Sequence, residues 1–161
     1  MIDIHFKKAD SEKEIKAVVE FIRQFPLGYP GYLDWTEKVY YELMNGKKNA
    51  YPAIYQRKIC GDLIFQTIGG NIIELKNLRI HDYLQRRGFA DFMTHQLEVD
   101  ASRTHTGIIV DTRKDNKIIR NLFEKRGYKQ INEENLYDKF NLDVVYYKAL
   151  TPNLKTNNSF F

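Results

Sequence analysis

The sequence contains little cysteine, since Cys60 is the single one among 161 residues. One cysteine cannot form a disulfide within the chain, so we expect a reducing, cytoplasmic environment. Cys60 and the four histidines also show none of the spacings that are typical of metal ligands. The sequence therefore predicts no metal site.

Long hydrophobic runs and a large excess of charge are missing as well. No apolar run approaches the ~20 residues that a membrane-spanning helix needs. The first ten residues, MIDIHFKKAD, lack the apolar core of a signal peptide. The formal net charge of +4 is small for a nucleic-acid-binding protein of this length. We therefore expect neither a membrane nor a nucleic acid as a partner.

The chain has ample material for a folded core. Hydrophobic residues make up 43% of the sequence and aromatic residues 14%, which argues against disorder. The length fits one domain, which we place at residues 1–150. Residues 151–161, TPNLKTNNSFF, are expected to form a flexible tail.

Hydrophobic periodicity predicts the order β-α-α-β-β-β-α-β-α-β-β. Such an order implies an α/β fold of the mixed α+β kind, with helices on both faces of one sheet. The crossover between the fourth and fifth strands should be right-handed and parallel. The first helix is expected to follow Ser11, which has capping-box spacing to Glu14. The expected strands are 2–6, 50–56, 59–68, 72–80, 107–112, 128–131 and 143–150, and the later helices are 34–44, 88–103 and 116–126.

The stretch QRRGFA, residues 85–90, lies between a predicted strand and a predicted helix. A helix start presents unpaired backbone N–H groups and a partial positive charge, which favour a phosphate. Gly88 would let an anion approach the backbone, and Arg86 and Arg87 would add positive potential. The alternative is an ordinary turn with solvated arginines. The stretch is neither a Walker motif nor a dinucleotide-binding motif of the form G-x-G-x-x-G.

Two blocks at the proper distance from each other resemble the GNAT superfamily of acetyl-CoA-dependent N-acetyltransferases. The first is Gln85–Ala90, which fits the family pattern Gln/Arg-x-x-Gly-x-Gly/Ala. The chain departs from the family at two positions, because Asp82 just upstream replaces a usual proline and Arg86 within the block replaces a usual glycine. The second block is Asn-x-x-Ala-x-x-Leu-Tyr-x-Lys-x-Gly-Phe, which is matched with substitutions by Asn116, Ile119, Leu122, Phe123, Lys125, Gly127 and Tyr128.

The resemblance implies a three-layer fold, whose mostly antiparallel sheet of about seven strands contains one parallel, splayed strand pair. It also implies an acetyl-CoA site. The pantetheine arm would lie beside strand 72–80, at Leu78, Arg79 and Ile80, with Asn116 and Phe123 near its reactive end. Asn116 has a second interpretation as a helix N-cap. The pyrophosphate would contact the backbone of the loop formed by Gln85, Arg86, Arg87, Gly88, Phe89, Ala90 and Asp91.

The resemblance further implies acetyl transfer to a primary amine, on a small molecule or a protein. A lysine-like amine has a pKa of about 10.4 and must first lose a proton. Glu74 is the candidate base, because it precedes Gln85 by the spacing of histone-acetyltransferase-type members. A surface glutamate is the alternative. Family members are often dimers, so a homodimer is also conceivable.

The general acid and the acceptor pocket are less clearly marked. Many members have a tyrosine where this chain has Phe123, so the alternative is an acyl-CoA-binding regulatory or sensor module with little activity. Tyr128, Tyr146 and Tyr147 are possible substitutes for the missing acid, or simply packing residues. Residues 133–143 are acidic and would attract a cationic amine, unless that charge is only solvated. The substrate slot is expected at Tyr29, Tyr32 and Trp35, which would otherwise cap the core.

Overall fold

The computed structural model describes residues 5–151, so the expected start of the first strand and nearly all of the expected tail lie outside the described residues. The helices of this part are α1 Glu12–Gln24, α2 Tyr32–Met44, α3 Phe89–Ala101 and α4 Lys117–Lys125, with a short 3-10 helix, η1, at Asp82–Leu84. Its strands are β1 His5–Phe6, β2 Asn49–Tyr55, β3 Lys58–Ile68, β4 Ile72–Ile80, β5 Gly107–Arg113, β6 Lys129–Glu134 and β7 Asp143–Ala149.

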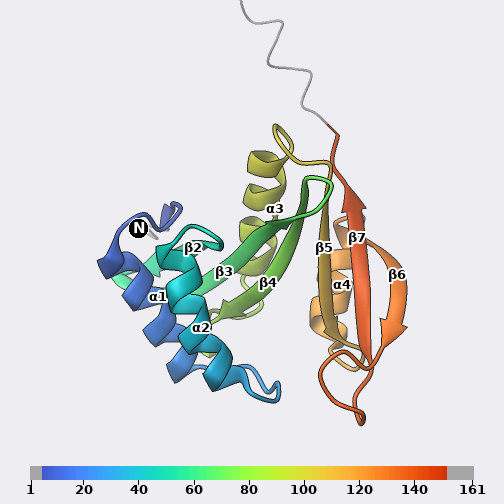
Figure 1. The fold of residues 1–161 in the computed structure, drawn as a ribbon, viewed down its shortest axis with the longest axis horizontal. Coiled ribbons are helices and arrows are strands. Elements are labelled where there is room, and N and C mark those ends of the chain that lie inside the picture. The colour runs from blue at the N-terminus through green and yellow to red at the C-terminus, as the bar shows by residue number, and fades with distance from the viewer. Residues whose placement is uncertain (1–4, 152–161) are drawn as a thin grey trace, which may run out of the picture.

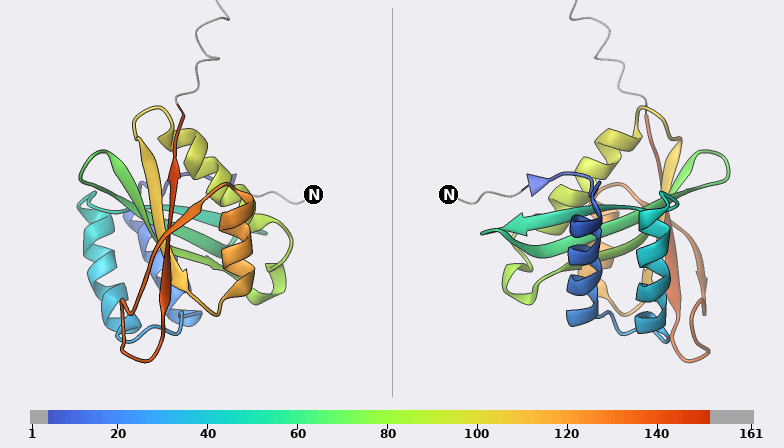
Figure 2. Two further views of the ribbon diagram at one scale, coloured as in Figure 1. Left: turned by 90° about the vertical axis from the view of Figure 1, so that its right-hand side faces the viewer. Right: turned by 60° about the vertical axis from the view of Figure 1, so that its left-hand side comes forward.

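The strands form one sheet of seven in the order β1-β2-β3-β4-β5-β7-β6, counted within the described residues. All neighbouring pairs are antiparallel except β4 and β5, which are parallel. Helices α1 and α2 cover one face of the sheet, and α3 and α4 cover the other (Figures 1 and 2). The predicted fold class and element order are therefore confirmed.

Two hydrophobic clusters fill the spaces between these layers. One joins α1 and α2 to the sheet, through residues such as Val18, Val39 and Ile64. The other joins α3 and α4 to the opposite face, through residues such as Leu97, Ile108 and Phe123. Since both faces of the sheet are buried, the middle strands are largely apolar.

Local signals explain where the helices begin. Ser11 caps α1 by accepting a hydrogen bond from the Glu14 N–H, and the Glu14 carboxylate accepts one from the N–H of Asp10 rather than that of Ser11. Helix α2 begins at Tyr32, two residues before the predicted Asp34, because Gly31 adopts a left-handed conformation that ends the preceding loop. Along residues 5–151, no helix reaches the length and apolar character required to cross a bilayer.

Strands β4 and β5 separate after a short paired stretch. Their ladder runs only from Ile72 and Gly107 to Leu75 and Val110, and both strands then continue apart. A register shift against β3 leaves Lys76 as an extra residue between the paired positions Leu75 and Asn77. Such a bulge bends a strand and reverses its side-chain alternation. The separation of these two strands creates the space for a site.

Candidate active site

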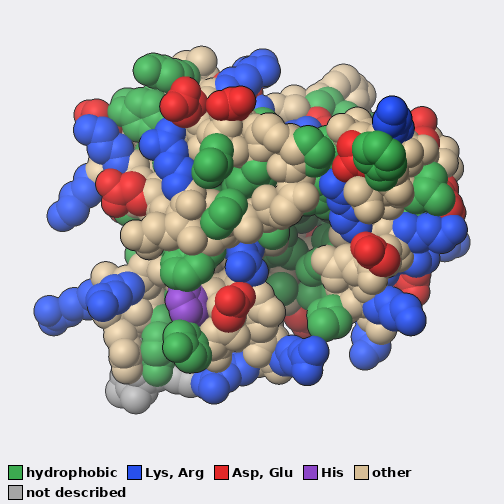
Figure 3. All heavy atoms as spheres, turned by 90° about the horizontal axis from the view of Figure 1, so that it is seen from below, with side chains coloured by type: hydrophobic (Ala, Val, Ile, Leu, Met, Phe, Trp, Pro, Cys, Tyr) green, Lys and Arg blue, Asp and Glu red, His purple; other side chains and the backbone are tan. Residues whose placement is uncertain are grey.

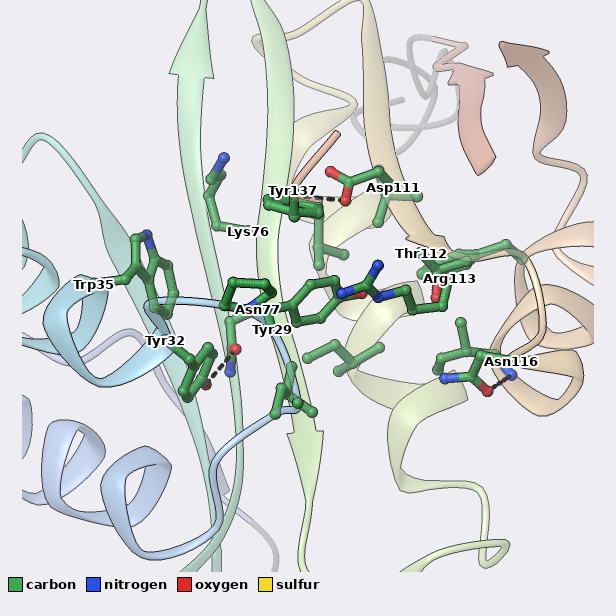
Figure 4. Close-up of a pocket in the computed structure, with 18 residues that line it drawn as sticks. Tyr29, Tyr32, Trp35, Lys76, Asn77, Asp111, Thr112, Arg113, Asn116 and Tyr137 are labelled. Atoms are coloured by element: carbon green, nitrogen blue, oxygen red, sulfur yellow. Dashed lines mark hydrogen bonds between the residues drawn. The ribbon is translucent and has the colours of Figure 1, made fainter. Parts of the chain in front are cut away.

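A cavity of about 380 Å³ lies between the diverging ends of β4 and β5. Its volume falls in the usual range for small-molecule sites. Viewed from the end of the sheet where β4 and β5 stop, the molecule is hollowed, with hydrophobic side chains inside and Lys and Arg side chains at the rim (Figure 3). The cavity is lined by residues 27–30, Tyr32, Trp35, residues 75–78, residues 110–113, Asn116, Ile119, Phe123 and Tyr137 (Figure 4).

Asp111 of β5 is a half-buried carboxylate in this cavity. Its Oδ2 accepts a hydrogen bond of 2.7 Å from the phenol of Tyr137. Burial raises the pKa of Asp111 above its ordinary value, although the Tyr137 hydrogen bond and the nearby charge of Lys76 act in the opposite direction. Asp111 is therefore a stronger base than a solvated aspartate and can accept a proton within the cavity.

The two cations of the cavity lining already have anionic partners. The Lys76 ammonium donates to Glu74 at 2.8 Å. The Arg113 guanidinium contacts Asp138 at 3.1 Å and Asp143 at 3.8 Å. It also lies 4.6 Å from the centre of the Tyr29 ring, a distance suited to a cation–π contact.

The opposite wall contains a chain of hydrogen bonds that leads from the cavity into the core. The Tyr32 phenol donates to the Asn77 side chain at 2.7 Å, and the Asn77 amide donates to Asp62 at 2.7 Å. Asp62 is fully buried, and this burial raises its pKa to about 7 despite the Asn77 hydrogen bond and the positive charge of Arg79. The Tyr32 ring is packed 5.3 Å from that of Trp35. The chain of bonds fixes the position of this aromatic wall.

The three predicted substrate residues, Tyr29, Tyr32 and Trp35, all line the cavity. Tyr32 is buried and Trp35 packs against the core between α1, α2 and the sheet. The alternative interpretation, that these residues cap the core, is therefore compatible with a place in the cavity lining. Tyr29 forms an edge contact with Tyr137, with ring centres 4.8 Å apart. Their assignment to substrate binding remains a prediction.

Helix α4 brings two predicted cofactor residues to the cavity. Asn116 is the N-cap of α4, and its side chain accepts a hydrogen bond of 3.3 Å from the Ile119 N–H, as the alternative interpretation expected. Phe123 is 1% exposed and packs edge-on against Tyr128, with ring centres 5.1 Å apart. Both residues line the cavity, so capping and packing do not prevent contact with a ligand.

The loop before α3 has the properties predicted for an anion site. Gly88 is the N-cap of α3, with φ of 85°, and no side chain caps this end. Within residues 5–151, the backbone N–H groups of 86–91 donate no hydrogen bond to the protein, and the first intrahelical bond is donated by Phe92. Arg86 and Arg87 are exposed beside them. These N–H groups are available to a phosphate.

Other side chains of this loop serve the protein itself. Phe89 is buried in the core below α3, so only its backbone faces outward. Ala90 also packs against this core. Asp91 forms an ion pair of 2.9 Å with Arg126. Gln85 uses its amide to hold the Ile80 carbonyl at 3.1 Å, which ties the loop to the end of β4.

The end of β4 that is not paired with β5 has side chains on both faces of the sheet. Leu78 lines the cavity, and Ile80 is buried in the same core cluster as α3. Arg79 points to the other face, where it donates to the Phe25 carbonyl at 3.0 Å. The stretch from Lys76 to Ile80 has no ladder pairing with β5, although the Ile80 carbonyl accepts hydrogen bonds from the Gln85 and Arg79 side chains.

Glu74 lies on the same sheet but is not part of the cavity lining. Because of the bulge at Lys76, Glu74 shares its face with Asn77 and not with Leu78. Burial raises the pKa of Glu74, but hydrogen bonds from Lys76 and Gln66 outweigh this and hold it below the ordinary value. Its role as a base remains a prediction.

The tyrosines considered as general acids lie away from the cavity lining. Tyr128 is buried beside Phe123, and Tyr147 faces Gly107 within the sheet. The Tyr146 phenol is held between Arg120 at 2.9 Å and Glu124 at 2.8 Å. All three are placed as packing residues, and the phenols that do line the cavity belong to Tyr29, Tyr32 and Tyr137.

Sequence reasoning missed Asp111 and Tyr137. The stretch GIIVDT indicated a buried strand but gave no sign that its aspartate faces a cavity. The expectation for the acidic 133–143 connection also needs correction. Glu133 and Glu134 belong to β6, and Glu133 is paired with Lys114 at 2.5 Å. Asp138 and Asp143 bind Arg113, and what the connection contributes to the cavity is instead Tyr137.

Comparisons with known proteins identify a family for this chain. The family model described as FR47-like protein matches residues 54–137. A search of curated proteins finds none that matches the chain.

Three solved structures have the same fold. An acetyltransferase of the GNAT family from Streptococcus pneumoniae has a TM-score of 0.76 at 13% identity, over 92% of this chain and 99% of its own. The ribosomal-protein-S18-alanine N-acetyltransferase from Escherichia coli has a TM-score of 0.76 at 17% identity, over 94% and 95%. An aminoglycoside 6'-N-acetyltransferase complexed with coenzyme A has a TM-score of 0.74 at 17% identity, over 93% and 98%.

Proposed function

The chain belongs to the FR47-like family and has the GNAT fold, and from this premise we propose that it is an N-acetyltransferase that acetylates a primary amine with acetyl-CoA. The main support is the combination of free N–H groups at the start of α3 with the opening between β4 and β5. A pyrophosphate needs the first feature, and a pantetheine arm needs the second. One structural neighbour holds coenzyme A.

Different residues of the proposed site would contact different parts of the cofactor. The N–H groups of residues 86–91 would hold the pyrophosphate, aided by the positive charge of Arg86 and Arg87. The free edge of β4 between Lys76 and Ile80 would pair with the pantetheine amides, as in strand addition. Acetyl-CoA supplies an activated thioester when it is bound. Phe123 would pack against its reactive end.

Asp111 is best placed to take the proton from the attacking amine. It lies in the cavity, its pKa is raised, and no charged group pairs with it within the described residues. Glu74 is the second candidate, because water can connect a carboxylate to a reaction centre that it does not touch. Its ion pair with Lys76 makes it the weaker base.

Many family members protonate the departing thiolate from a tyrosine at the position of Phe123, which has no proton to give. A thiol with a pKa of about 8.5 can leave without such help, and losing general-acid help costs roughly 10²–10⁴ in rate. The missing tyrosine supports a second candidate function, a module that binds acyl-CoA and turns it over slowly. Both functions require the same cofactor site.

Two measurements separate the candidates. Calorimetry with acetyl-CoA tests the shared site, and we expect saturable binding. Release of free thiol from acetyl-CoA over a panel of amines tests transfer, with hydrolysis in the absence of amine as the control. Binding with amine-dependent thiol release supports the transferase, binding without it supports the module, and no heat of binding contradicts both.

A further inference from the structure

The charges around the cavity carry information about the acceptor. The two lining cations, Lys76 and Arg113, face four carboxylates, of which Glu74, Asp138 and Asp143 bind them directly. The remaining carboxylate, Asp111, lines the cavity itself. We propose that the acceptor is a cationic amine with no carboxylate on its amino-bearing carbon. This inference rests on the proposed transferase function.

Asp111 is the anion that is open to a ligand. Among the described residues no lysine, arginine or histidine lies within 4.0 Å of its carboxylate. Its one hydrogen-bond donor is the neutral phenol of Tyr137. An ammonium group bound here would gain a charge-assisted hydrogen bond in a partly buried setting.

The cations, in contrast, are already paired with carboxylates of the protein. The Lys76 ammonium is bonded to Glu74. The Arg113 guanidinium donates to Asp138 through Nη2, and its Nε lies 3.8 Å from the Asp143 carboxylate. The third nitrogen of Arg113, Nη1, is buried without a partner and therefore not exposed to the cavity solvent. An amino acid placing its ammonium at Asp111 would hold its own carboxylate close to that anion with nothing to neutralise it.

The walls fit the rest of a cationic amine. In Figure 4, the rings of Tyr29 and Tyr137 lie between Trp35 on one side and Asp111 on the other. Aromatic faces attract cations and also contact an apolar stem. The cavity therefore favours an ammonium group on an alkyl or arylalkyl stem over a zwitterion.

Matched acceptors that differ only in the carboxylate provide the test. The pairs are tyramine with tyrosine, phenethylamine with phenylalanine, and histamine with histidine, each assayed for kcat/KM by thiol release at saturating acetyl-CoA. We expect the amine of each productive pair to exceed its amino acid by at least roughly tenfold. Tyrosine methyl ester, which keeps the bulk of the carboxylate but not its charge, should resemble tyramine.

A variant tests whether the charge of the acceptor's carboxylate, and not its size, causes the discrimination. Glu74→Gln removes the partner of Lys76 and leaves an unpaired cation at the cavity, so the tyramine-to-tyrosine ratio should fall in this variant. Leu33→Gln on the exposed surface of α2 is the control and should keep the wild-type ratio. Equal rates within the pairs, or faster amino acids, would overturn the inference and leave the transferase function intact. If no amine of any pair releases thiol, the inference fails together with that function.

Discussion

The phenol of Tyr137 donates a 2.7 Å hydrogen bond to Asp111 and so connects the loop between β6 and β7 to the cavity end of β5. Burial raises the pKa of Asp111, and this bond limits the rise. Burial, together with the charges of Asp111 and Asp143, in turn raises the pKa of Tyr29 to about 12. The pKa values of groups that line the cavity therefore depend on a contact between segments that are distant in the sequence.

Replacing Asp111 with asparagine should remove the base without changing the shape of the cavity. We expect kcat/KM for an amine to fall by roughly 10²–10⁴, as for the loss of a general base. Steady-state thiol release measures this, and calorimetry should show unchanged affinity for acetyl-CoA. Glu74→Gln is the matched comparison and should lose much less. A larger loss in Glu74→Gln than in Asp111→Asn would transfer the role of base to Glu74.

Tyr137→Phe should shift the pH dependence of the reaction. The phenol stabilises the charged form of Asp111, so its loss raises the pKa of that carboxyl further. Activity that needs ionised Asp111 will then appear at higher pH, and we expect the acidic limb of kcat/KM to move up by roughly half to one pH unit. A profile that keeps its acidic limb while only its height changes would assign Tyr137 a purely structural role.

Gly88 tests the anion site at the start of α3. Gly88→Trp and Gly46→Trp place the same side chain at two positions with similar φ, 85° and 79°, and open space around both. Each should lose a similar stability of about 1 kcal/mol from backbone strain. Only Gly88→Trp should also weaken acetyl-CoA binding, by at least roughly tenfold in calorimetry. Equal affinities in the two variants would refute the site.

Asp62 should make the protein less stable as the pH rises. Its pKa is about 7 in the fold and near 3.8 when unfolded, so its contribution is complete below pH 4 and is lost as the pH rises towards 7. Denaturant unfolding of wild type and Asp62→Asn at pH 4.5 and 8 isolates this effect from the other carboxylates. The difference in free energy of unfolding should change by a few kcal/mol in favour of the variant at the higher pH. A pH-independent difference would contradict the raised pKa.

The fold and the position of the loop before α3 could be predicted from the sequence, because both depend on local signals. Periodicity identified β4 and the helix that follows it, and the glycine at 88 marked the turn between them. The aromatic wall was also predictable, since Tyr29, Tyr32 and Trp35 lie within seven residues and share one loop and helix start.

The chemistry of the cavity was harder to predict because it depends on long-range contacts. Tyr137 reaches Asp111 across 26 residues of sequence, and the sequence of an irregular loop gives no sign of where its one phenol will lie. The bulge at Lys76 reverses the alternation of β4, so a simple period of two would place Glu74 on the wrong face, that of Leu78. Charge composition was also a poor guide, because Glu133, Asp138 and Asp143 are paired with the protein's own cations.

Phe123→Tyr offers a last prediction, on the missing general acid. The Phe123 ring lines the cavity and packs against Tyr128 and Tyr146, with ring centres at 5.1 and 6.1 Å. A hydroxyl added on the cavity side would have a proton for the departing thiolate, so thiol release should become faster, by roughly tenfold in kcat, if thiolate departure limits the rate. Single-turnover and steady-state measurements show whether that step or product release is limiting. Phe65→Tyr, buried in the same core outside the cavity lining, is the control for adding a hydroxyl and should not accelerate the reaction. A Phe123→Tyr variant that folds, binds acetyl-CoA and is no faster in single turnovers would mean that this protein's thiol leaves without help from that position.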